Sequence, residues 1–323
     1  MYGNQITTNN ISNCQYMFAN STNLTKVPFD INISSNCKTI SNTFSSCTAL
    51  TQLPLIKGDL TPPTGNYSGT LNMAGMLQNC YNLREIPYDY FHNFGGDAFW
   101  EASKKYYGDR SYLFSNCRSL RKIPDISMLP TTDSLYSCLY YNMLNNCYAL
   151  DEVTDLPVLN QIARTSNMFY GTFNGCNRVK NITFAMNEDG TPKTAEWESQ
   201  TIDLHDYVGF ATRYDGSDIL NYNSGITADK LIKDETSYQS LKDDPDSWAR
   251  GYGYCRYNHD SAVATINSLP DTSAYLAANG GTNTIKFRGD SGNLIDGGNG
   301  AINTLTEEEI AVATAKGWTV TLA

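Results

Sequence analysis

The stretch FSNCRSLRKIP at residues 114–124 belongs to a phrase that recurs along the chain and decides the fold. In this phrase an aromatic or aliphatic residue precedes two polar residues and a Cys. Two aliphatic residues then follow at three-residue steps, often with Pro after the second. Further copies occupy residues 18–28, 44–54, 77–87, 144–153 and 173–182, and the first of them has Ser in the Cys place. The Cys positions of successive copies are 26, 33, 37, 30 and 29 residues apart.

Repetition of one apolar phrase predicts how the copies pack. A single copy cannot close a core, whereas stacked copies build a continuous one, and the unequal spacing places insertions in loops. The sequence therefore predicts an α/β repeat fold: a leucine-rich-repeat solenoid of short strands and helical turns with long loop insertions. The Leu-x-x-Ile-Pro piece is expected to be the strand, ended by Pro because Pro lacks the ladder donor. The side chains expected in the repeat core are Phe18, Leu24, Phe44, Cys47, Leu50, Leu77, Cys80, Leu83, Phe114, Cys117, Leu120, Leu144, Cys147, Leu150, Phe173, Cys176 and Val179.

The nine cysteines are an odd number, which excludes a complete set of disulfides within one chain. Five of them occupy the same place in the phrase, so we expect small buried apolar side chains in a ladder. No Cys-x-x-Cys pair occurs, and the three His are not spaced as partners, so the sequence predicts no metal site and no cofactor. A bridge between Cys37 and Cys47, or between Cys138 and Cys147, stays open.

The C-terminal residues predict a cap for the open end of the stack. Thr306 followed three residues later by Glu309 forms a capping box at a helix start. Residues 318–322 alternate as a strand whose even-numbered side chains share one face. A helix near residues 261–269 and a strand at residues 284–288 are expected to form a similar pair.

Three regions follow from these patterns. Residues 1–184 are expected to form the solenoid of about six irregular copies, residues 185–260 an acidic insertion that contains aromatics, and residues 261–323 a repeat-like cap. Charge divides the chain at nearly the same place: residues 1–182 hold 13 basic and 12 acidic side chains, whereas residues 183–323 hold 10 and 21. Such an asymmetry indicates two regions with different surroundings.

Composition excludes two classes of protein. The 23 Lys and Arg against 33 Asp and Glu give a net charge of -10 without a basic face, so we expect no nucleic-acid partner. No stretch approaches the ~18 apolar residues of a membrane helix, so we expect no membrane insertion. Charged residues are only 17% and tyrosines number 22, a composition typical of adhesive surfaces. The first five residues predict no secretory signal, and a trimmed precursor would look the same.

The repeat phrase resembles the BspA-like leucine-rich repeats of bacterial surface proteins and related repeats of mycoplasma surface lipoproteins. The resemblance covers about residues 14–184. Residues 305–320 resemble the closing unit of such proteins in gut Bacteroidales and their phages. The resemblance implies a leucine-rich-repeat solenoid with a role in adhesion, host contact or the virion surface, and it implies no catalytic residues.

Aromatic side chains gather in the segments between copies. Tyrosine combines a flat apolar face with a polar tip at low entropic cost, which suits it to binding surfaces. Two interpretations stay open: these aromatics pack the insertions against the flank of the stack, or they contact sugars or a protein surface. The candidate binding residues are Tyr88, Tyr90, Trp100, Tyr106, Tyr107, Tyr140 and Tyr141.

These observations predict a non-enzymatic phage virion protein, a fibre or tail-associated appendage that displays leucine-rich repeats on the virion surface for contact with a host surface protein or glycan. Its other expected partners are virion proteins and copies of itself in a homo-oligomer. The first alternative is a bacterial cell-surface adhesin with BspA-like repeats. The second is a glycan hydrolase on a repeat scaffold, since two catalytic carboxylates can come from any part of a fold.

Overall fold

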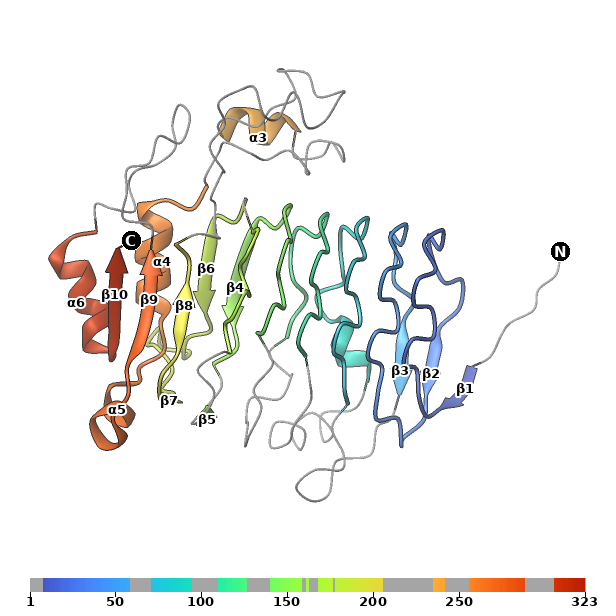
Figure 1. Ribbon diagram of the computed structural model, residues 1–323, viewed down its shortest axis with the longest axis horizontal. Helices are drawn as coiled ribbons and strands as arrows, with labels where there is room; N and C mark the ends of the chain where they lie inside the picture. Colours follow the sequence, from blue (N-terminus) through green and yellow to red (C-terminus); the bar gives the residue numbers. More distant parts are fainter. Residues whose placement is uncertain are drawn as a thin grey trace.

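The computed structural model shows the chain as a row of turns that lie side by side (Figure 1). It describes residues 8–58, 71–94, 110–126, 140–158, 161–162, 168–176, 178–205, 235–241, 256–287 and 305–322. Along the long axis the turns follow the order of the sequence, from the N-terminal copies at one end to the C-terminal strands at the other. The strands of the described residues form small open sheets and no closed barrel.

Short parallel strands link neighbouring turns. They are β1 (Thr8–Ile11), β2 (Ile31–Ile33), β3 (Ile56–Gly58), β4 (Glu152–Leu156), β5 (Gln161–Ile162), β6 (Asn181–Phe184), β7 (Glu196–Trp197), β8 (Thr201–Asp203), β9 (Asn283–Phe287) and β10 (Trp318–Leu322). The order is β1-β2-β3 in one sheet and β10-β9-β8 in another, while β4 pairs with β6 and β5 with β7. Both β7 and β8 lie within residues 185–260, and β8 continues the C-terminal sheet through its pairing with β9.

Most helical segments lie in the C-terminal half (Figure 1). They are η1 (Tyr90–Phe94), α3 (Glu235–Leu241), α4 (His259–Ser268), α5 (Ser273–Asn279) and α6 (Glu307–Ala315). The capping box of Thr306 and Glu309 is confirmed at the start of α6, and the strand expected at residues 318–322 is β10. Within β10, Trp318 is buried but Leu322 is exposed at the strand end. None of the described helices is long and apolar enough to cross a membrane.

Backbone hydrogen bonds join each copy of the phrase to the next. The Phe18 amide donates to the Thr43 carbonyl at 2.9 Å, and the same bond recurs from Phe44 to Met76 at 3.0 Å. It recurs again from Phe114 to Met143 at 3.1 Å. Because each copy's donors are satisfied by its neighbour, the copies hold one another at a fixed register.

The prediction that Pro ends the strand is wrong for the first two copies. There β2 and β3 begin after Pro28 and Pro54, not before them. Proline lacks a donor, so it interrupts the ladder where the chain enters the strand. In the copies without Pro, β4 and β6 overlap the end of the phrase, because the backbone donor is present there.

The side chains predicted to form the repeat core are buried, with two exceptions in the first copy. Phe18 and Leu24 are partly buried and pack against the core, and the Phe18 ring stacks on Phe44 at a centroid distance of 5.5 Å. Burial of one Leu or Phe side chain contributes roughly 1.5–3 kcal/mol. The continuous row of such side chains therefore stabilises copies that are too small to fold alone.

Each repeat cysteine fills the core and also donates a hydrogen bond to a main-chain carbonyl. The Sγ atom of each donates to a main-chain carbonyl of the preceding copy: Cys47 to Phe18 (3.0 Å), Cys80 to Phe44 (3.2 Å), Cys117 to Leu77 (3.1 Å), Cys147 to Phe114 (3.2 Å) and Cys176 to Leu144 (3.3 Å). Alanine would fill part of this space but could not donate. Cys37 and Cys47 both carry free thiols, so the bridge considered between them is not formed, and Cys138 lies outside the described residues.

We expect the repeat thiols to resist alkylation in the folded protein. Burial raises the pKa of Cys147 to about 12 and raises the pKa of Cys117 as well. The thiolate is the reacting species, and a rise of about three units lowers its population about a thousandfold. Iodoacetamide labelling at pH 8, followed by mass spectrometry, should modify these residues only after guanidinium unfolding. Equal labelling rates in the folded and unfolded protein would contradict the thiol ladder.

Candidate functional site

Three tyrosines on neighbouring copies form a row, which we call the tyrosine row: Tyr112, Tyr141 and Tyr170. The rings of Tyr141 and Tyr170 stack at a centroid distance of 5.4 Å and an interplanar angle of 19°. The ring of Tyr112 meets Tyr141 edge-on at 5.7 Å. Tyr170 is 62% exposed, Tyr112 is exposed and Tyr141 is half-buried, so the row presents aromatic surface to solvent.

The backbone holds this row through a left-handed residue at the same place in each copy. Tyr112, Asn142 and Gly171 have φ values of 59°, 49° and 64°. The Tyr112 amide donates to the Tyr141 carbonyl at 3.1 Å, and the Asn142 amide donates to the Tyr170 carbonyl at 2.9 Å. A Cβ at Gly171 would collide with Asn142 Oδ1, so this close approach favours glycine at position 171. The tyrosine row therefore stands on a rigid support.

Two of the candidate binding residues lie in the core. The Tyr90 hydroxyl donates to the Pro54 carbonyl at 2.9 Å, and the Tyr140 hydroxyl donates to the Pro157 carbonyl at 2.7 Å. Both rings are buried, so neither can contact a molecule docked on the surface. The structure brings only Tyr141 into the tyrosine row, and Tyr88 is exposed at a separate place. Three candidates, Trp100, Tyr106 and Tyr107, lie outside the described residues.

Tyr112 and Tyr170 were not among the candidates, although a signal for Tyr170 exists in the sequence. Tyr141 and Tyr170 both lie six residues before the Cys of their copies, and Tyr112 lies five before its Cys. Side chains at equivalent places of stacked repeats lie next to one another. Counting from the Cys would therefore have grouped Tyr141 with Tyr170, but not Tyr112, which lies one place nearer its Cys.

A second line of side chains occupies the position directly after the Cys of neighbouring copies, and its members contact one another. The guanidinium carbon of Arg118 lies 4.2 Å from the ring centroid of Tyr81 and 5.9 Å from that of Tyr148. Tyr81 and Tyr148 are half-buried. These rings therefore have a cationic partner within the chain, whereas the Tyr170 ring faces solvent.

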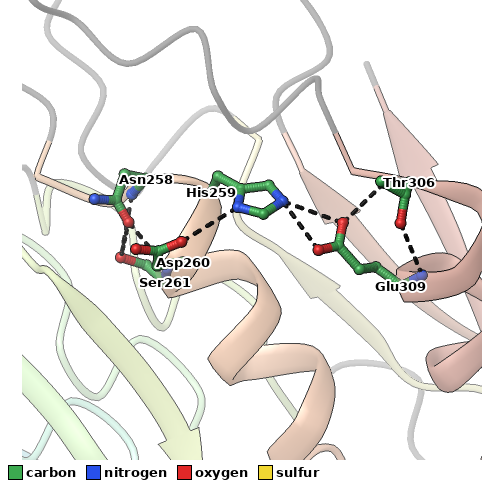
Figure 2. A network of polar contacts seen from close by, with 6 residues as sticks. All are labelled: Asn258, His259, Asp260, Ser261, Thr306 and Glu309. Atoms are coloured by element: carbon green, nitrogen blue, oxygen red, sulfur yellow. Dashed lines mark hydrogen bonds and ion pairs between the residues drawn. The ribbon is translucent and has the colours of Figure 1, made fainter.

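The sequence His259-Asp260-Ser261 lies in a polar network between α4 and α6, and it does not have the geometry of a nucleophile and its base (Figure 2). In the α4 capping box the Ser261 hydroxyl oxygen accepts from the Asn258 backbone N–H at 3.1 Å, and the hydroxyl also donates to Asn258 Oδ1 at 3.0 Å. His259 Nε2 lies 3.1 Å from Glu309 and Nδ1 lies 3.3 Å from Asp260. Both ring nitrogens face carboxylates, which favours the protonated form of His259, and the ring joins the starts of two helices.

This network predicts that stability depends on pH above neutrality. Hydrogen bonds to Glu309 and Asp260 raise the pKa of His259 above 6.5. Its contribution is therefore complete below 6.5 and is lost as the pH rises through the raised value. The backbone N–H of Thr306 lowers the pKa of Glu309, so that carboxylate stays charged throughout this window.

The expected effect is small because the His259 side chain is partly exposed and solvent screens its ion pairs. From pH 6 to pH 9 we expect His259 to account for a fall of about 1–2 °C in Tm. His259→Gln should remove that part of the fall, as differential scanning calorimetry at the two pH values would show. An identical pH dependence in the variant would contradict the role of His259.

Among the described residues no three His, Cys, Asp or Glu side chains converge as metal ligands. Comparison of the chain with protein-family models, curated proteins and solved structures found no match. The surface chemistry of the molecule therefore carries the functional argument.

Proposed function

We propose that the protein is a non-enzymatic surface-contact protein, built as a leucine-rich-repeat solenoid and displayed as an appendage on a phage virion. The tyrosine row is the surface through which it contacts host glycans. The observation that carries this proposal is a row of three tyrosine rings in mutual contact, two of them exposed, on a rigid backbone. Resemblance of the repeat phrase to BspA-like proteins supports the same role.

A glycan fits the chemistry of the tyrosine row. The rings follow one another at 5.4–5.7 Å and offer apolar faces, while the hydroxyl groups at their edges can donate to and accept from sugar hydroxyls. Sugar rings have apolar C–H faces that stack on such aromatics. A support that is already rigid reduces the entropy lost on binding.

Two further observations support a non-enzymatic protein that folds in a cytoplasm. The seven described cysteines carry free thiols, which suits folding under the reducing conditions of a host cell before virion release. The groups most typical of catalysis are committed elsewhere: the repeat thiols donate to carbonyls, and His259 pairs with Glu309 and Asp260. Assembly with other virion proteins or with copies of itself belongs to the same proposal.

The test compares binding of purified protein to intact host cells and to a glycan panel. A Tyr141→Ala/Tyr170→Ala variant removes the half-buried and the exposed ring of the stacked pair, each contributing about 0.5–1.5 kcal/mol, so binding should weaken about tenfold or more. Tyr16→Ala is the matched control, because Tyr16 is an exposed tyrosine of the first copy outside the row. It should bind as the unchanged protein does.

Two outcomes would contradict the proposal. Undiminished binding by the double variant would show that the tyrosine row is not the contact surface. Turnover of a glycan that is lost on replacing one specific Asp or Glu would favour the hydrolase instead.

A further inference from the structure

A hollow of about 150 Å³ is lined by residues of the third, fourth and fifth copies. These residues follow the Cys of their copies, whereas the tyrosines of the tyrosine row precede it. Tyr88, the segment 122–126 and the segment 152–155 border it. The Asp125 amide donates to the Tyr88 carbonyl at 2.7 Å, which fixes these two edges together. An engineered cavity of this volume holds one benzene molecule, so the hollow is large enough for a single flat side-chain head group.

A bulge in β4 shapes one wall. The β4–β6 pairing is regular at Val153 and resumes at Leu156, with a register shift between them. Thr154 and Asp155 fill the shift and are exposed, and Asp155 has a φ of 56°. A bulge redirects the side chains that it carries, and here both residues border the hollow.

The aromatic wall is Tyr88, whose side chain is 70% exposed. The nearby carboxylate of Asp125, followed by partial burial and by Asp155, raises the pKa of the Tyr88 hydroxyl. The ring therefore stands in a negative field. A cation placed against it gains attraction both from the ring face and from the carboxylates.

An internal cation offsets only part of this negative charge: Lys122 Nζ lies 2.8 Å from Glu152. His92 Nε2 lies 3.1 Å from Asp125. Asp155 takes part in no ion pair among the described residues, and its carboxylate stands at the rim of the hollow. Charge complementarity therefore favours a positively charged occupant.

We propose that the hollow is a docking site for an arginine side chain of a partner protein. A guanidinium is flat enough to stack on Tyr88 and carries a fork of donors that matches the Asp155 carboxylate. This site is formed by different residues from the tyrosine row and does not depend on the glycan proposal.

Ligand-observed NMR on the full chain tests the site with the peptide acetyl-Gly-Arg-Gly-amide. The matched ligand is the same peptide with citrulline, which keeps the shape of arginine but is neutral. We expect saturable millimolar binding of the arginine peptide and no detectable binding of the citrulline peptide. Asp155→Asn, which suits the left-handed backbone, should weaken binding about fivefold, and Tyr88→Ala should do the same. Tyr16→Ala is the control and should leave binding unchanged.

Each of three results would overturn the proposal: equal binding of the two peptides, unchanged binding by both Asp155→Asn and Tyr88→Ala, or no saturation by the arginine peptide. Equally tight binding of a lysine peptide would show that the hollow accepts any cationic side chain and does not select a guanidinium. That outcome would overturn the role of stacking. Circular dichroism of each variant shows that the fold is kept.

Discussion

Replacing Asn116 with alanine is expected to lower the free energy of unfolding by about 3 kcal/mol. Asn116 stands in a ladder of side chains directly before the repeat cysteines: its Nδ2 donates to Asn79 Oδ1 at 2.9 Å, and its Oδ1 accepts from Asn146 Nδ2 at 3.0 Å. Two hydrogen bonds contribute about 1 kcal/mol each. The residue also has a φ of 60°, a conformation that costs alanine about 1–2 kcal/mol.

Asn116→Gly separates the two contributions. Glycine adopts the left-handed backbone freely but makes no ladder bonds, so it should lose about two thirds as much as alanine. Urea unfolding of the three proteins, followed by circular dichroism, measures the difference. Equal losses in the two variants would show that the backbone conformation contributes nothing, and losses under about 0.5 kcal/mol in both would contradict the ladder.

The second large effect is expected at the buried ion cluster that fixes the C-terminal part to the copies. Arg256 Nη1 lies 3.0 Å from Asp151 Oδ1 and also donates to the Arg178 carbonyl. Burial lowers the pKa of Arg178 to about 10, so Arg178 remains charged at neutral pH. Asp151→Asn would remove the carboxylate that pairs with the buried Arg256 guanidinium and whose charge also acts on Arg178. We expect a loss of about 3 kcal/mol in the free energy of unfolding.

An exposed ion pair provides the matched control. Lys57 Nζ lies 2.7 Å from Asp30 Oδ2, with the two side chains 50% and 47% exposed, whereas the Asp151 side chain is 28% exposed. Asp30→Asn should change stability by less than about 0.5 kcal/mol, because solvent screens the pair. A loss at Asp151 no larger than that at Asp30 would show that the cluster does not anchor the C-terminal part.

The repeat phrase predicts its own core well, because residues at equal distances from the Cys occupy equivalent places in stacked copies. The same rule extends upstream of the phrase, where the prediction stopped. The residues seven positions before the Cys place are all buried: Cys14, Ile40, Met73, Arg110, Tyr140 and Phe169. Arg110 conceals this pattern, since a charged residue is rarely buried; its guanidinium donates to the Leu71 carbonyl. If that pattern is not recognised, the sequence predicts a surface position for the Tyr140 side chain.

Contacts between distant segments were not predictable in the same way. Asp151 and Arg256 are 105 residues apart and belong to no common period. The pairing of β8 with β9 likewise joins residues 201–203 to residues 284–286. Local rules succeed at the C-terminus because a capping box needs only four consecutive residues, as at Thr306 and Glu309.

Display on a virion is tested most directly by immunogold electron microscopy with an antibody raised against this chain. Phage particles and uninfected bacterial cells from the same culture are labelled side by side. We predict gold on the particle appendages and none on the uninfected cells. Gold on the envelopes of uninfected cells, with bare particles, would contradict the virion role and favour a cell-surface adhesin.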